Sequence, residues 1–304
     1  MQMRSRLAAA GLLDVADKLD AGVRLDLEDG VRLSDTPDLL ALGWLANRER
    51  ERRHGARAYF NYNIRLEATN VCVASCLFCS FARLKPGDPG AYTMSLEQAW
   101  DKLRSRSHQP LTEVHVVNGL HPDLPFDYYT DLLRGFKAIR PAVHLKCFTA
   151  VEIAFFSDIY HMSDEEVLVA LMAAGLDSLP GGGAEIFADR VRKKIAHDKC
   201  GADRYLDIHR IAHRLGMRSN VTMLYGHIET RAGDIRSPAL VFAHNEVAAS
   251  ICIRAPLQAA RCLTTRSSRP TLSCSPIQRL PRPRLFDVES DVTALCVRSS
   301  TVYS

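Results

Sequence analysis

The sequence predicts an α/β fold in which short parallel strands alternate with helices. From residue 60 onward, β-branched runs recur and helical segments follow them. The expected strands cover 63–66, 113–117, 143–148, 178–179 and 220–224, with a helical segment after each of the first four. This alternation implies a parallel sheet with right-handed crossovers, closed as a barrel or doubly wound. In both architectures ligands bind at the carboxyl ends of the strands.

Several expected helices carry their own start and stop signals. Ser95–Gln98 and Ser163–Glu166 fit the capping box, and Gly175 and Gly216 stand where glycines end helices. Before the first strand, residues 12–58 read as a helical segment, in which Asp35-Thr36-Pro37-Asp38 starts a helix.

The composition indicates a globular protein and argues against a membrane protein or a nucleic-acid-binding protein. The chain has 304 residues, of which 47% are hydrophobic and 24% charged, which is typical of a globular protein. Lys and Arg number 39 against 35 Asp and Glu, and this balance argues against nucleic acid as a partner. The apolar run 7–13 is broken by charged residues, and no stretch approaches the ~18 apolar residues of a spanning helix. We therefore expect a cytoplasmic protein with no membrane partner.

Composition also divides the chain into three parts. We expect a helical segment over 1–58, an α/β core over 59–230 and an atypical tail over 231–304. The tail is rich in Arg, Ser and Pro and has no Lys. It shows no strand–helix alternation, which indicates a disordered or frame-shifted segment and a barrel that stops after the fifth strand. We expect poor order beyond about residue 260, since prolines recur there.

Three of the nine cysteines stand together directly after the first expected strand. Cys72, Cys76 and Cys79 have the spacing C-x₃-C-x₂-C. Three thiolates from one loop can hold three irons of a [4Fe–4S] cluster and leave the fourth iron open for a small molecule. The alternatives are incidental thiols or a structural zinc with a distant His. Cys147 and Cys200 are isolated and read as small hydrophobic residues.

With an aromatic residue, Phe78, before the last cysteine, this loop resembles the signature of the radical S-adenosylmethionine (SAM) superfamily. The resemblance implies a partial (β/α)₆ TIM-like barrel, a [4Fe–4S] cluster on the three cysteines and SAM bound to the open iron. It also implies an electron donor such as flavodoxin or ferredoxin.

Further motifs over residues 12–230 resemble the aminofutalosine synthase family. They lie at 59–61, 67–73, 116–125, 148–153, 177–185 and 219–230. The resemblance implies a transferase of menaquinone biosynthesis. In that family the 5′-deoxyadenosyl radical adds to 3-[(1-carboxyvinyl)oxy]benzoate, and 6-amino-6-deoxyfutalosine results. The alternatives are a related radical SAM cyclase or deazaflavin synthase, or a truncated remnant that only binds metal.

The expected cofactor contacts all belong to the cysteine loop or follow expected strands, and no catalytic residue is assigned. They are Phe78, Asn118, Gly119, Glu152, Gly182 and Glu185. Asn118 and Gly119 follow the second strand, where Gly119 permits close approach of the backbone to a ligand.

Each of these interpretations has a structural alternative. Glu152 and Glu185 are also suited to capping a helix, and the glycines 181–183 to forming a tight turn. His121 is a candidate acid or base, or a turn residue before Pro122. Four cations are candidates for binding substrate carboxylates, or else form a solvated helix face: Arg190, Arg192, Lys193 and Lys194. His209 and His213 are four residues apart, as in a metal pair, but lack further ligands and are expected on the surface.

Overall fold

The computed structural model describes residues 2–58, 60–225, 228 and 249–254. Four helices precede the first strand: α1 (Gln2–Ala9), α2 (Leu13–Asp20), α3 (Leu27–Asp35) and α4 (Leu39–His54). They have a small hydrophobic core of their own, built on Leu7, Leu12, Val15, Ala41 and Leu45. The start signal before α4 is confirmed, because the Asp38 side chain accepts from the N–H of Ala41.

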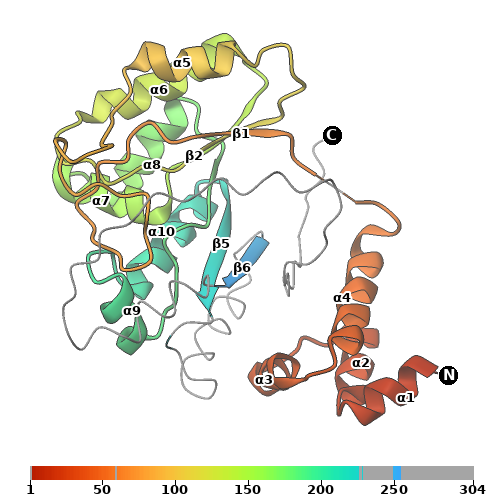
Figure 1. Ribbon diagram of the computed structural model, residues 1–304. Coiled ribbons are helices and arrows are strands. Elements are labelled where there is room, and N and C mark those ends of the chain that lie inside the picture. The colour runs from red at the N-terminus through yellow and green to blue at the C-terminus, as the bar shows by residue number, and fades with distance from the viewer. Residues whose placement is uncertain (1, 59, 226–227, 229–248, 255–304) are drawn as a thin grey trace, which may run out of the picture.

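The remainder is one parallel sheet with helices between its strands (Figure 1). The strands are β1 (Asn63–Leu66), β2 (Glu113–Val116), β3 (His144–Cys147), β4 (Ser178–Leu179), β5 (Arg218–Tyr225) and β6 (Ala249–Arg254), paired in sequence order. The helices are α5 (Leu96–Arg104), α6 (Phe126–Ile139), α7 (Ala150–Tyr160), α8 (Asp164–Ala173), α9 (Asp189–Ile195) and α10 (Ala202–Arg214). The predicted α/β alternation is confirmed.

The sheet does not stop after five strands. Residues 249–254 form β6, which pairs with β5 from Asn220↔Ala249 to Tyr225↔Arg254. The alternating apolar residues of Ser-Ile-Cys-Ile are typical of a strand and lie in the one strongly apolar stretch of the tail. The expectation of a barrel ending at β5 is corrected to this extent. The expected disorder beyond residue 260 concerns residues outside those that the structure describes.

Local capping fixes where the helices begin. Ser95 with Gln98 and Ser163 with Glu166 form the two predicted capping boxes, and Thr149 with Glu152 forms a third. Gly175 and Gly216 adopt positive φ directly after the caps of α8 and α10, as their positions predicted. The first residues of α5, α7 and α8 are therefore fixed by capping side chains.

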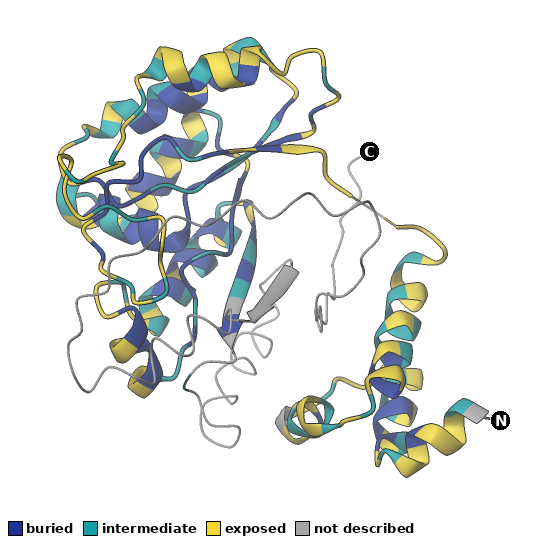
Figure 2. Ribbon diagram, in the orientation of Figure 1, coloured by how far each residue is buried: buried dark blue, intermediate teal, exposed yellow. Residues whose placement is uncertain are grey.

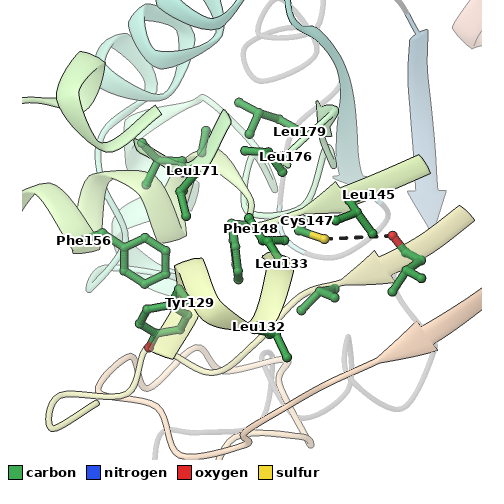
Figure 3. Close-up of a cluster of buried hydrophobic side chains, with 14 of the residues drawn as sticks. Tyr129, Leu132, Leu133, Leu145, Cys147, Phe148, Phe156, Leu171, Leu176 and Leu179 are labelled. Atoms are coloured by element: carbon green, nitrogen blue, oxygen red, sulfur yellow. Dashed lines mark hydrogen bonds between the residues drawn. The ribbon is translucent and has the colours of Figure 1, made fainter. Parts of the chain in front are cut away.

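The main hydrophobic core fills the space between the sheet and its helices. Alternate residues of the strands, such as Val116, Leu145 and Cys147, are buried against Leu132 and other residues of the helices (Figures 2 and 3). The Cys147 thiol lies 4.0 Å from the carbonyl oxygen of Val114. Burial raises its pKa well above the ordinary value, so Cys147 is a hydrophobic core residue, as predicted.

His209 is a core residue as well, and its expected position on the surface was wrong. Only 2% of it is exposed, because it lies on the face of α10 that packs against the protein, with its ring centroid 4.7 Å from that of Tyr205. Neither ring nitrogen has a hydrogen-bond partner within the described part of the chain. Burial lowers the pKa of His209 to about 3, with a smaller contribution from His213. His213 is half-buried and shares a 2.7 Å hydrogen bond with Ser219, so the two histidines are not arranged as a metal pair.

This burial predicts a loss of stability in mild acid. The folded state keeps His209 neutral down to about pH 3, whereas the unfolded chain takes up the proton near pH 6.5. Protons therefore favour unfolding between these values, and stability falls as the pH falls below 6.5. From pH 7 to pH 5 the free energy of unfolding should drop by about 2 kcal/mol through this residue alone.

The measurement is urea unfolding at both pH values for the wild-type chain and the variant His209→Leu. The variant should lose less stability over this interval than the wild type, by that amount. An identical pH dependence in both chains would refute the assignment of a neutral, buried His209.

Candidate active site

The three clustered cysteines lie in the loop between β1 and α5, at the carboxyl end of the sheet. All three are free thiols, and exposure increases from buried Cys72 through Cys76 to exposed Cys79. Cys72 is fixed by its N–H, which donates to the carbonyl of Arg83, and the N–H of Val73 donates to Leu120 beyond β2. The start of the loop is therefore held against two neighbouring segments of the barrel mouth.

The connection between α9 and α10 supports the middle of this loop. Asp198 accepts hydrogen bonds from both the N–H and the hydroxyl of Ser75, at 2.7 and 2.8 Å. The carbonyl of Ile195 accepts from the N–H of Leu77 at 2.9 Å. Residues on both sides of Cys76 are thus fixed by a segment more than one hundred residues away in the sequence.

Lys199 belongs to the same connection and lies beside Cys76. Its ammonium is 2.6 Å from Oε1 of Glu185 and 5.4 Å from the centre of the Phe78 ring, a cation–π distance. Burial acts to lower the pKa of Lys199, but the charges of Glu185 and Cys76 outweigh it and raise the pKa. Burial raises the pKa of the Cys76 thiol to about 11, and Lys199 opposes this rise. A permanent cation therefore lies next to the central cysteine.

Phe78 and Cys76 also make apolar contacts on this side. Both pack against a small cluster of buried residues on and around α9, made of Ile186, Val191, Ile195 and Ala196. Beyond Cys79, the Arg83 guanidinium donates to a series of loop carbonyls, those of Ser80, Phe81, Ala82 and Pro89. Both ends of the loop are held by bonds that do not involve the thiols.

Gly119 brings the segment after β2 into direct contact with the cysteine loop. A Cβ on Gly119 would lie 2.2 Å from the carbonyl oxygen of Val71, so no other residue fits without moving the backbone. Its N–H donates to Thr69 at 2.9 Å. Gly119 was expected to let the chain approach a ligand, and here the close approach is to the backbone next to Cys72.

Asn118 follows β2 and bonds to the segments after β1 and β3. Its side-chain amide nitrogen is unpaired within the described ranges. Its Oδ1 accepts from the N–H of Ala68 at 2.7 Å, and its own N–H donates to Glu152 at 2.9 Å. The Nδ2 group is buried and has no partner among the described residues. A ligand with an acceptor atom would satisfy this amide.

Glu152 is fully committed to structural hydrogen bonds. One carboxylate oxygen accepts from Asn118, and the other accepts from the N–H and the hydroxyl of Thr149 at 2.7 and 3.0 Å. Burial raises the pKa of Glu152 to about 7, against the effect of these donors. The structure supports its helix-capping alternative, while Glu185 is paired with Lys199 in the loop after β4.

The glycines 181–183 form a tight packed turn. The carbonyl of Gly181 accepts from Tyr205 and Thr222, and a Cβ on Gly182 would touch the Thr149 methyl group at 3.0 Å. Gly183 has φ of +89°. Arg192, expected among the exposed cations, is 3% exposed and donates to the carbonyls of residues 183, 184 and 200. It supports this turn rather than a substrate.

The remaining candidate residues either bond to a neighbouring residue or are exposed to solvent. His121 is buried, and its Nδ1 accepts from the N–H of Asp123 at 3.1 Å, which is the turn role. Arg190, Lys193 and Lys194 are exposed, as expected of a solvated helix face. Lys199 was not identified from the sequence, because its partners Glu185 and Phe78 come from two separate loops.

The protein has three free cysteines at the mouth of a partial parallel barrel. Comparison with known proteins identifies the class to which this fold and site belong. Residues 66–235, more than half of the chain, match the family model described as the Radical SAM superfamily. The chain belongs to this superfamily of enzymes, which use a [4Fe–4S] cluster and SAM. Among solved structures, methylornithine synthase superposes with a TM-score of 0.61 at 17% identity, covering 79% of this chain and 67% of that one. At this identity the similarity shows the fold alone.

Within the superfamily, the chain is similar to aminodeoxyfutalosine synthases. It is 49% identical over 219 residues to that of Thermus thermophilus and 48% identical over 216 residues to that of Streptomyces coelicolor. These alignments cover 72% and 71% of this chain but only 59% and 56% of the relatives. A 5-amino-6-(D-ribitylamino)uracil–L-tyrosine 4-hydroxyphenyl transferase of Methanopyrus kandleri is 37% identical over 71% of this chain and 57% of its own length.

The chemistry of the donors fits the two cofactors of the superfamily. Three free thiols from one loop match the three cysteine ligands that leave one iron open. The unpaired Nδ2 of Asn118 is a donor for a ligand at the same mouth. Within the described residues, no three Cys, His, Asp or Glu side chains are gathered closely enough to hold a metal ion as they stand. In those residues, too, no helix is both long and apolar enough to cross a membrane.

We predict that Cys76→Ala abolishes most iron binding, because the loop then offers only two thiolates. Iron and sulfide should be measured after anaerobic reconstitution, where the wild-type chain should hold about four irons. Cys200→Ala, which removes a half-buried thiol outside the loop, is the matched control and should retain the full amount of iron. Equal iron in the two variants, or zinc without iron in the wild-type chain, would contradict the assignment.

We also predict that Lys199→Met weakens iron retention. The change removes the cation beside Cys76 and leaves the Glu185 carboxylate half-buried without its 2.6 Å partner. The fraction of iron kept against a competing chelator should fall clearly below that of the wild type. Lys193→Met, which removes an exposed cation paired with Asp189 on α9, is the control and should behave as wild type. If both variants keep iron equally well, Lys199 does not support the loop.

Proposed function

We propose that this chain carries the catalytic core of a transferase that joins the adenosyl group of SAM to 3-[(1-carboxyvinyl)oxy]benzoate. Methionine and the carboxyl carbon of the adduct leave, and 6-amino-6-deoxyfutalosine forms for menaquinone biosynthesis. The observation that carries the proposal is the identity of 48–49% to two aminodeoxyfutalosine synthases over 71–72% of this chain. SAM would be consumed as a co-substrate. A flavodoxin or ferredoxin would supply the electron.

Different residues at the mouth of the barrel would hold the cluster and SAM. Cys72, Cys76 and Cys79 would hold the cluster, which when reduced supplies the electron that cleaves the sulfonium of SAM. Asn118 would donate through its unpaired Nδ2 to the bound cofactor. Glu185 and Lys199 form an ion pair beside Cys76, where they would fix the electrostatics of this end of the site.

The other proposed cofactor residues act through the backbone or through packing. Phe78 stacks under Lys199 and would wall the cluster from water. Gly119 permits a contact with the backbone of Val71 that no side chain allows, and a Cβ on Gly182 would lie tightly against the Thr149 methyl group at 3.0 Å. Glu152 would position Asn118 through its hydrogen bond to the Asn118 N–H rather than contact the cofactor itself.

Two alternatives remain distinct from this proposal. A hydrogen-abstracting relative of the cyclase or deazaflavin type has weaker support, since the 4-hydroxyphenyl transferase of Methanopyrus is 37% identical. A remnant that only binds metal is motivated by the composition of residues 231–304, which differs from that of the core. Translation of the coding DNA in the other two frames beyond codon 230 tests the frame-shifted form of this idea.

We predict that adenine-labelled SAM transfers its label to the benzoate-derived product. The reconstituted chain should be incubated anaerobically with reductant, labelled SAM and 3-[(1-carboxyvinyl)oxy]benzoate, and the products identified by mass spectrometry. Cys76→Ala should give none, since it lacks a cluster ligand. Label confined to free 5′-deoxyadenosine, with the substrate intact, would favour the hydrogen-abstracting relatives. A loaded wild-type chain without any SAM cleavage would support the remnant.

A further inference from the structure

The first three strands of the barrel have an unusual inner face. Strands of a parallel sheet are commonly buried on both sides and consist mainly of apolar residues, and barrel interiors are usually packed with branched side chains. Here β1, β2 and β3 read Asn-Ile-Arg-Leu, Glu-Val-His-Val and His-Leu-Lys-Cys. Every second residue is polar or charged, and the apolar residues between them are buried against the helices. The inner face is therefore built for something other than packing.

The strand register aligns three basic residues on this face. Arg65 pairs with His115, and His115 pairs with Lys146. We define these three as the basic row. Neighbouring strands are about 4.8 Å apart, so one small ligand can reach all three side chains. Each is the penultimate residue of its strand, which puts the row just below the cysteine loop and Asn118.

One buried carboxylate, Glu113, accompanies the row and is already saturated. It lies 2.8 Å from the Lys146 ammonium and 3.7 Å from His115, and accepts from the amides of Asn61 and Asn63 at 3.2 and 3.3 Å. Burial opposes its ionisation, but His115 and Lys146 outweigh this and lower the pKa of Glu113 to about 2. Glu113 therefore keeps its charge and has little capacity for a further donor.

The cations of the row, in contrast, keep unused donors. The Lys146 ammonium has three N–H groups and, among the residues that the structure describes, one carboxylate partner, Glu113. The one ion pair of Arg65 among the described residues is with Glu67 at 3.6 Å, too long for a hydrogen bond, and 69% of its side chain is exposed. Arg65 thus offers a planar fork suited to a carboxylate. The face therefore has more hydrogen-bond donors than its own carboxylates satisfy.

We propose that the basic row binds a carboxylate of the substrate, with Arg65 as the principal contact and Glu113 as the residue that positions Lys146 and His115. The inference rests on the proposed function for the identity of the substrate, a benzoate with two carboxylates. The row alone assigns only the chemical class, a small carboxylate held beneath the cofactors.

The test uses an unreactive ligand so that binding is measured apart from the reaction. Isophthalate, a benzene with two carboxylates, is titrated calorimetrically into the reconstituted full-length chain, with its dimethyl ester as the neutral probe. Arg65→Gln should weaken isophthalate binding at least about tenfold, the effect of losing one charge-assisted contact, and should leave the weak binding of the ester unchanged. Arg104→Gln, an exposed arginine of outer helix α5 paired with Glu97 and Asp101, is the matched control and should bind as wild type.

A second variant covers the buried part of the row. The double variant Lys146→Met with Glu113→Gln removes a cation and its partner together, so that no buried charge is left alone. It too should weaken isophthalate binding. If Arg65→Gln and the double variant both bind isophthalate as tightly as wild type, or if wild type binds the ester as tightly as the diacid, the proposal is overturned.

The two proposals fail separately. If the chain yields no adenosylated product but loses isophthalate binding in Arg65→Gln, the basic row is upheld and the proposed reaction is wrong. If Arg65→Gln forms the product with an unchanged KM and unchanged isophthalate binding, the reaction is upheld and the role of the row is overturned.

Discussion

The carboxylate of Glu152 joins the carboxyl ends of the first three strands, and the mouth of the barrel depends on it. It accepts from the backbone of Asn118 after β2 and from Thr149 after β3, while the Asn118 amide accepts from Ala68 after β1. A buried polar group that loses its hydrogen-bond partner costs about 1–3 kcal/mol. Because the acceptor is buried, these bonds compete little with water. The loops that carry the cysteines and the cofactor contacts start from the positions that this network sets.

The cysteine loop is supported from outside rather than by its own sequence. Val71 contacts Gly119, Ser75 is bonded to Asp198, and Phe78 lies under Lys199. These partners belong to two other connections of the barrel: Gly119 follows β2, and Asp198 and Lys199 lie between α9 and α10. Changes far from the cysteine motif can therefore displace a cluster ligand such as Cys76. The presence of three cysteines is thus not sufficient for the chain to hold a cluster.

Local sequence signals predicted much of this architecture. They could not predict contacts between residues that are far apart in the sequence. Capping residues such as Ser95 and Ser163 act within four residues, so a sequence shows them directly. Lys199 and Asp198 gain their roles from partners in distant loops, which no spacing rule reveals. His209 looked like a surface residue because histidine is polar, but the packing of α10 overrode that preference. The basic row was detectable: the alternation in Glu113-Val-His-Val is at odds with a strand buried on both faces.

The hydrogen bonds of Asn118 also fix which way its amide faces. Ala68 presents an N–H, so only the carbonyl oxygen of the side chain can meet it, and the nitrogen must occupy the opposite position. The mouth of the barrel therefore has a defined polarity at this point, donating rather than accepting. Aspartate has the same shape but would place a second acceptor there, repelling a carboxylate that asparagine would bind. The choice between two nearly isosteric residues thus selects the sign of the partner atom.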